Sequence, residues 1–63
     1  MAYICYIYQG GDEIPYMEVL GDISAELAEA RLRQILRDRP RAMRGELWED
    51  DRLAVSLRQD VRA

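Results

Sequence analysis

The chain has 63 residues, a formal net charge of −3 and 49% hydrophobic residues, which fits one small domain spanning residues 1–63. A domain of this size buries only about 60% of the surface that its unfolded chain exposes, so we expect marginal stability. The sequence has one cysteine and no histidine, which excludes an internal disulfide and the usual ligand sets for structural zinc. We therefore expect no metal and no cofactor. A partner or a dimer interface would add stability.

Charge is distributed unevenly along the chain. Residues 1–30 carry six acids and no base, a formal charge of −6. Residues 31–45 carry +5 and residues 46–63 carry −2. All nine basic residues are arginine, a bias typical of GC-rich bacterial and phage genomes. Net acidity weakens any general attraction to nucleic acid, which binds proteins chiefly through Lys and Arg contacts to phosphate.

The N-terminal segment predicts a β-hairpin. Residues 2–8 are rich in tyrosine and isoleucine and precede Gly10-Gly11, a pair that suits a tight turn. With that turn, Ile7 faces Ile14 and the second strand ends near Leu20. The first strand has no preceding basic residues and is far shorter than the roughly 20 residues that span a bilayer, so we expect a cytoplasmic protein of a bacterial host cell.

Residues 22–39 predict the only long amphipathic helix. Asp22 or Ser24 can cap its first turn, and Pro40 ends it. Charged residues occupy the opposite side of the helix, where Glu29 and Arg33 form a favourable i,i+4 pair. At about 100° per residue, the apolar residues share one stripe, which we expect to be buried: Ala25, Ala28, Leu32, Ile35 and Leu36.

Residues 45–49 and 52–58 predict a second hairpin around Asp50-Asp51, with Leu47 in the core opposite Val55. Residues from about 59 to 63 have no apolar pattern and are expected to fray. The fold class is therefore α+β, in the order ββαββ: one four-stranded antiparallel sheet of two hairpins, with a single helix packed on one face.

One helix covers only one face of such a sheet, so the other face must meet water or a partner. The first hairpin is apolar on both faces. One face carries Ile4, Tyr6, Met17 and Val19, and the other carries Tyr3, Cys5, Ile7, Ile14 and Tyr16. Because Glu18 belongs to the second set, we expect that set to lie away from the helix, together with Trp48. An exposed apolar patch of this kind usually marks an interaction surface.

Catalytic candidates are few. The acids Glu49, Asp50 and Asp51 fit a solvated hairpin tip better than a metal or general-acid cluster, because aspartate is a turn residue and no histidine completes a site. Gly10-Gly11 lacks the lysine and the glycine spacing of a phosphate loop. Cys5 has no histidine to act as its base, so a buried hydrophobe is the better interpretation. The sequence predicts no catalytic residue, and hence a protein that is not an enzyme.

Two features could bind nucleic acid. The first is a cluster of arginines, and a solvated helix end is its simpler explanation: Arg31, Arg33, Arg37, Arg39, Arg41 and Arg44. The second is a set of aromatic residues on the sheet, Tyr3, Tyr16 and Trp48, which could form a stacking platform for RNA. Such platforms normally include Lys and Arg, whereas the first hairpin carries Asp12, Glu13 and Glu18. A protein interface is therefore favoured.

The order of segments resembles a family of short, uncharacterised proteobacterial ββαββ domains. The resemblance rests on an aromatic first strand, a Gly/Asp turn, an Ala- and Arg-rich helix and an acidic hairpin: Tyr3 to Tyr8, Gly10-Gly11-Asp12, Ala25 to Arg39, and Glu46 to Asp51 leading into Leu53 to Leu57. It implies the same fold and no catalytic residues. By type, a tiny acidic protein with a GC-rich bias is also similar to phage-encoded anti-CRISPR inhibitors.

These observations predict a small, acidic, non-enzymatic protein-binding module. Its most specific form is a phage-type inhibitor that occupies a basic, nucleic-acid-binding surface of a bacterial complex, with a homodimer through the uncovered sheet face as a further expectation. The residues expected to meet the partner are the acids and the sheet aromatics: Asp12, Glu13, Glu18, Glu49, Asp50, Asp51, Tyr3, Tyr16 and Trp48. The alternative is a nucleic-acid-binding regulator that uses the cluster from Arg31 to Arg44.

Overall fold

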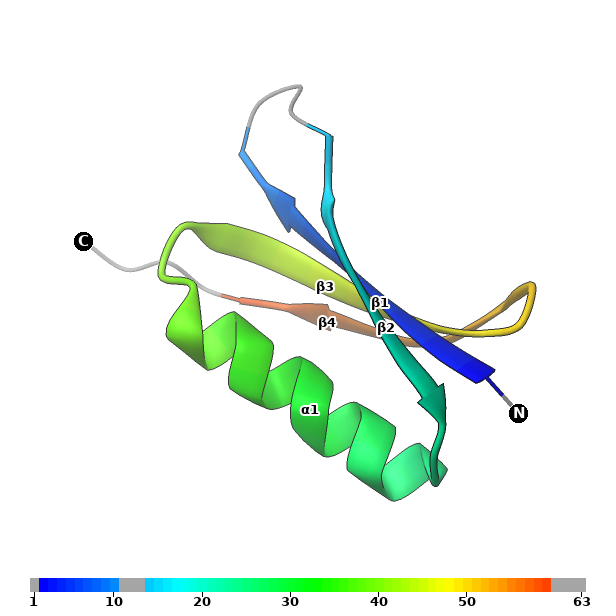
Figure 1. The fold of residues 1–63 in the computed structure, drawn as a ribbon. Helices are drawn as coiled ribbons and strands as arrows, with labels where there is room; N and C mark the ends of the chain where they lie inside the picture. Colours follow the sequence, from blue (N-terminus) through cyan, green and yellow to red (C-terminus); the bar gives the residue numbers. More distant parts are fainter. Residues whose placement is uncertain (1, 11–13, 60–63) are drawn as a thin grey trace.

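The computed structural model describes residues 2–10 and 14–59 and has the order ββαββ (Figure 1). The sheet is antiparallel, with strand order β2-β1-β3-β4, and α1 lies across one of its faces. This arrangement confirms the predicted fold class. The elements are β1 (Ala2–Gln9), β2 (Tyr16–Asp22), α1 (Ala25–Asp38), β3 (Ala42–Glu49) and β4 (Arg52–Arg58).

The helix begins and ends where its capping residues predict. Ser24 is the N-cap, and its hydroxyl oxygen accepts a hydrogen bond from the backbone N–H of Leu27 at 3.1 Å. Asp38 is the last helical residue, two positions before Pro40. The buried stripe is confirmed for Ala28, Leu32, Ile35 and Leu36. Ala25 is exposed, so the predicted stripe is too long at its N-terminal end.

The helix packs tightly against the sheet at Gly45 in the middle of β3. A β-carbon placed on Gly45 would lie 2.7 Å from Leu32 Cδ1 and 3.2 Å from Leu36 Cδ1. Glycine therefore removes the atom that would hold the helix away from the sheet. The core forms around this contact from nine buried residues: Tyr3, Cys5, Ile7, Ala28, Leu32, Ile35, Leu36, Ala42 and Leu47.

The predicted orientation of the first hairpin is wrong. Cys5 and Ile7 have no exposed surface and Tyr3 is 5% exposed, so this face lies under the helix and not away from it. The prediction rested on Glu18, whose charge disfavours burial. The structure resolves that conflict with Arg31 of α1, whose guanidinium donates to Glu18 Oε2 at 2.7 Å and to Oε1 at 3.1 Å. An acid can therefore lie at the margin of the covered face.

The pairing of the first hairpin also differs from the prediction. Ile7 pairs with Tyr16 rather than with Ile14, and Cys5 pairs with Glu18, a shift of two residues. Because side chains alternate with a period of two, this shift changes the cross-strand partners but not the faces. β1 ends at Gln9 and β2 begins at Tyr16, so the connection is longer than a two-residue turn. Residues 11–13 lie outside the described residues.

The second hairpin agrees with the prediction more closely. Leu47 pairs with Val55, and the turn contains Asp50, which has a positive φ of 55°. Aspartate tolerates this left-handed geometry better than most residues. Gln59 does not fray, because its backbone N–H donates to the Met43 carbonyl at 2.8 Å and its side-chain amide donates to the Arg39 and Ala42 carbonyls. The rest of the tail that we expected to fray, residues 60–63, lies outside the described residues.

Candidate functional site

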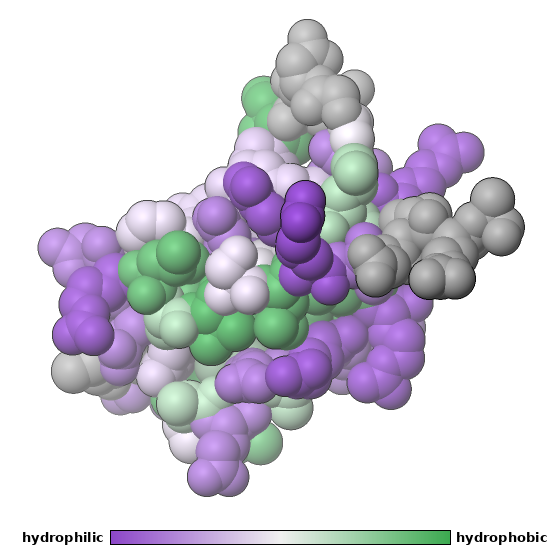
Figure 2. Space-filling view, turned by 180° about the vertical axis from the view of Figure 1, so that it is seen from behind, coloured by the Kyte–Doolittle hydropathy of each residue, from purple (hydrophilic) through white to green (hydrophobic). Residues whose placement is uncertain are grey.

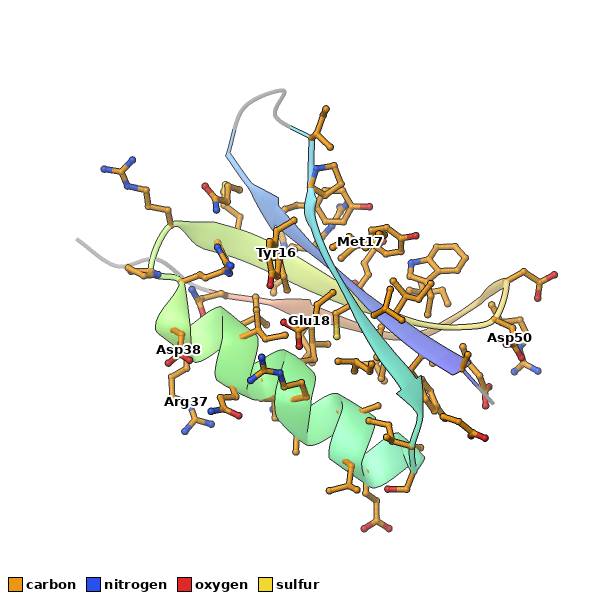
Figure 3. All side chains as sticks on the ribbon, viewed as in Figure 1. Tyr16, Met17, Glu18, Arg37, Asp38 and Asp50 are labelled. Atoms are coloured by element: carbon orange, nitrogen blue, oxygen red, sulfur yellow. The ribbon has the colours of Figure 1, made fainter. Side chains whose placement is uncertain are left out.

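The sheet has one face that no described element covers, which we call the open face. Cross-strand pairing assembles this face, because each of its residues stands opposite another one on the neighbouring strand. On β2, Figure 3 shows Met17 on this side, whereas Tyr16 and Glu18 lie on the side toward α1. The open face consists of Ile4, Tyr6 and Tyr8 of β1, Met17 and Val19 of β2, Arg44, Glu46 and Trp48 of β3, and Leu53, Ser56 and Arg58 of β4.

Glu46 is the polar centre of the open face. Its Oε1 accepts hydrogen bonds from the Tyr8 hydroxyl and from the Trp48 indole N–H, both at 3.1 Å. Its Oε2 lies 3.7 Å from Arg44, whose guanidinium carbon is 4.4 Å from the centre of the Tyr8 ring. Burial, and then the Glu46 carboxylate, raise the pKa of Tyr8, so its hydroxyl stays a donor at neutral pH. These contacts fix the orientation of both aromatic rings.

The apolar part of the open face is substantially exposed. Val19 is 65% exposed, Met17 is 52% exposed and Leu53 is 48% exposed. Tyr6 and Trp48 are half-buried beside them. Tyrosine, tryptophan and methionine are enriched at protein interfaces, where rigid aromatic rings supply contact area at a small cost in conformational entropy. The open face therefore combines residue types that are enriched at protein interfaces with substantial exposure.

The three aromatic residues that we predicted as one platform do not share a face. Tyr3 is buried under the helix, where its hydroxyl donates to Glu49 Oε2 at 3.2 Å. Tyr16 also lies on the covered side, with the guanidinium carbon of Arg39 3.8 Å from its ring centre. Only Trp48 is on the open face, as predicted. The stacking-platform hypothesis is wrong for this trio because it followed from the reversed orientation of the first hairpin.

The predicted acidic contacts occupy separate places. Asp50 and Asp51 are exposed in the turn between β3 and β4, and Glu49 is half-buried next to them. Glu18 is bound by Arg31 and by the Tyr16 hydroxyl, and the hydrogen bond from Arg31 is the main reason that its pKa is lowered. Asp12 and Glu13 lie outside the described residues. Of the predicted acids that the structure describes, only Asp50 and Asp51 project freely into solvent, because Glu49 accepts a hydrogen bond from the Tyr3 hydroxyl. We call Glu49, Asp50 and Asp51 the acidic tip.

Contacts within the chain already engage most of the arginine cluster. Arg31 pairs with Glu18, and Arg33 pairs with Glu29 at 2.7 Å. Arg39 lies over Tyr16 and Arg44 over Tyr8. Arg37 and Arg41 have no ion pair with any described acid. Four of the six arginines therefore have partners within the chain.

Of the residues that β1, β2 and β3 contribute to the open face, the sequence prediction placed only Trp48 correctly: it assigned Ile4, Tyr6, Met17 and Val19 to the helix side and missed Tyr8, Arg44 and Glu46. Glu46 and Arg44 could have been found from the alternation of side chains between the two faces of β3. Once Leu47 is assigned to the core, its neighbours Glu46 and Trp48 must both lie on the opposite face. The same period extends this face to Arg44.

Neither a reactive cysteine nor a metal cluster occurs among the described residues. Burial raises the pKa of Cys5 to about 11, so its thiol stays protonated and is a poor nucleophile at neutral pH. Among residues 2–10 and 14–59, no group of three His, Cys, Asp or Glu could hold a metal ion. Within the same ranges, no helix has the length and apolar character needed to cross a membrane.

Comparison of the chain with family models, with curated proteins and with solved structures finds no match.

Proposed function

We propose that the protein is a non-enzymatic protein-binding module whose open face docks a protein partner. The observation that carries this proposal is the cluster of Tyr6, Met17, Val19, Trp48 and Leu53 on a sheet face that no described element covers. Burying such a face releases water from apolar surface, which is the main driving force of protein association. Because the Glu46 network holds Tyr8 and Trp48 in place, little conformational entropy is lost when they bind.

We further propose that the partner presents a basic surface. The acidic tip adjoins the end of the sheet, Glu46 lies at the centre of the open face, and the whole chain carries a net charge of −3. Complementary charge accelerates association and rejects acidic competitors. A basic, nucleic-acid-binding surface of a bacterial complex fits this chemistry, so the most specific form of the proposal is an inhibitor of the anti-CRISPR type that works in the cytoplasm of a bacterial host.

A photocrosslinking experiment tests the docking surface. A benzophenone amino acid replaces Val19 on the open face or, as the matched control, Leu27 on the outer side of α1; these side chains are 65% and 62% exposed. Illumination in a bacterial lysate, followed by mass spectrometry, should give a defined adduct only from position 19. Adducts from position 27 alone would move the interface to the helix and refute the proposal.

Charge reversal tests the partner's chemistry. Once the adduct is identified, the purified partner is titrated with a variant in which Glu49, Asp50 and Asp51 are all arginine, and with Arg41→Ala as the control. We expect the triple variant to bind at least tenfold more weakly, with a difference that shrinks at high salt. Equal affinity of the triple variant, or a loss confined to Arg41→Ala, would contradict an acid-mediated interface.

The alternative function, a nucleic-acid-binding regulator, predicts a different result. A regulator that uses the arginine cluster should retard DNA or RNA in a gel-shift assay at low salt, and an acidic inhibitor should not. Its strongest support is Arg37 and Arg41, which have no ion pair with any described acid. Arg39, Arg52 and Arg58 also lack an ion pair within the described residues, but the net charge of −3 weakens any attraction to phosphate, so we favour the protein-binding module.

A further inference from the structure

We infer that the outer edge of β4, beside the C-terminal half of α1, is a second binding site, and that it takes an acidic, extended peptide segment of a partner protein. This edge is separate from the open face. It does not depend on the function proposed above, because its charge is opposite and, of its lining residues, only Arg58 borders the open face, where it pairs with Arg44.

A cleft of about 280 Å³ runs between α1 and the end of β4. Its apolar part comes from Leu36 of the helix and Leu57 of the strand, and arginines stand along its sides. Figure 2 views the molecule from behind, where β4 lies, and shows a band of hydrophobic side chains with hydrophilic side chains above and below it. The lining residues are Arg33, Leu36, Arg37, Leu57, Arg58 and Gln59.

The backbone of β4 is available for strand addition. β4 pairs with β3 on one side and is the last strand of the described sheet, so its outer N–H and C=O groups have no described strand partner. Residues 53–57 carry no charge that would block an incoming strand. Beyond the strand, the three hydrogen bonds of Gln59 fix the backbone beside the cleft. A peptide that adds to this edge gains main-chain hydrogen bonds in a preformed register.

The charge of the cleft selects an acidic segment. Arg37 and Arg58 are exposed and have no ion pair with any acid of the described ranges, and Arg33 shares only Glu29. Guanidinium groups bind carboxylates through paired N–H donors. Nucleic acid would satisfy the arginines but could use neither the unpaired strand edge nor the apolar part formed by Leu36 and Leu57. An extended peptide that alternates acidic and apolar side chains satisfies all three features.

Fluorescence anisotropy with synthetic probes tests this site on the full chain. The main probe is a fluorescein-labelled peptide of four alternating Glu-Val pairs. Its controls are the Lys-Val version, a version N-methylated at alternate residues so that it cannot add to a strand, and a short oligothymidine. We expect the Glu-Val peptide to bind at low salt and each control to bind at least tenfold more weakly.

Variants then locate the bound peptide. Arg37→Glu and Arg58→Glu should each weaken binding at least tenfold, whereas Arg52→Glu, at the other end of β4 and outside the cleft, should change it less than threefold. Val19→Glu on the open face should leave peptide binding unchanged, so failure here is separable from failure of the proposed function.

Four results would overturn the inference. The first is a loss of peptide affinity in Arg52→Glu as large as in Arg37→Glu or Arg58→Glu, and the second is equal affinity for the N-methylated and the unmethylated Glu-Val peptide. The third is tighter binding of oligothymidine than of the Glu-Val peptide, and the fourth is peptide binding that appears only in an Asp60→Asn variant. The last would assign the cleft to the chain's own acid.

Discussion

The close approach of α1 to β3 predicts that Gly45→Ala and Leu32→Ala are energetically coupled. Leu32 is fully buried, so its truncation should cost about 2 to 4 kcal/mol of unfolding free energy. The added methyl group of Gly45→Ala would stand 2.7 Å from Leu32 Cδ1, well inside van der Waals contact. Either the leucine or the helix must move, and overpacking of this kind costs about 1 to 3 kcal/mol.

The double variant should be more stable than the sum of the single effects allows. In it, the 2.7 Å contact with Leu32 is gone, only the 3.2 Å contacts with Leu36 remain, and the alanine methyl group fills part of the space that Leu32 leaves. We expect a coupling energy of about 1 to 2 kcal/mol, measured by urea denaturation of all four proteins. Because a 63-residue domain is expected to have only about 3 to 9 kcal/mol of stability, the series should be run in stabilising sulfate.

A matched cycle with Leu27→Ala supplies the control. Leu27 lies on the same helix but is 62% exposed, and its truncation should simply add to that of Gly45→Ala. If the Gly45 and Leu32 changes were also additive within about 0.5 kcal/mol, α1 would not rest on β3 as described, and the assignment of the covered and open faces would be refuted.

Three further predictions follow from the two faces. The hydrogen bond from Arg31 lowers the pKa of Glu18, so this pair stabilises the fold above the ordinary glutamate pKa, and the stabilisation is lost as the pH falls through the lowered value. Glu18→Gln should therefore lower the free energy of unfolding at pH 7 and match wild type in acid. Glu29→Gln is the exposed-pair control, and a difference that does not change with pH would contradict the prediction. Cys5 is fully buried and its pKa is raised to about 11, so it should resist a thiol reagent at pH 8 until the protein unfolds, and rapid labelling of the native chain would place this face in solvent. Without its partner, the protein should self-associate through the open face at high micromolar concentration, as measured by light scattering, and Val19→Glu should abolish the self-association. A monomeric wild type under those conditions would argue against association through this face.

The sequence was sufficient to predict the buried side of each element that has apolar residues on one side only. The helix stripe of Leu32, Ile35 and Leu36 and the pairing of Leu47 with Val55 both follow from local periodicity, and both are observed. The ion pair on the outer side of the helix was equally predictable from local spacing, since Glu29 and Arg33 are one turn apart and do pair. Residues four apart on a helix are neighbours whatever the tertiary structure, so this ion pair could be predicted from the sequence.

The orientation of the first hairpin could not be obtained in the same way. Its strands are apolar on both faces, so periodicity alone does not choose between them. The only tie-breaker was Glu18, and its placement depends on Arg31, which is thirteen positions away and on a different element. A carboxylate is excluded from the margin of a core only when it lacks a partner. Whether a partner is present depends on the tertiary structure and cannot be predicted from the local sequence. The open face was consequently predicted with the wrong tyrosines, although Trp48 was correctly placed.

The central claim, that the open face is the protein-docking surface, is tested most directly by comparing Val19→Glu with Leu27→Glu. The two parent side chains are almost equally exposed and differ chiefly in the side of the molecule on which they lie. Both variants should fold with wild-type stability, because neither position is in the core. In titrations against the partner identified by crosslinking, we predict that Val19→Glu loses at least tenfold in affinity and that Leu27→Glu retains wild-type affinity. Retained affinity in Val19→Glu, together with a loss in Leu27→Glu, would contradict the account and assign docking to the outer surface of α1.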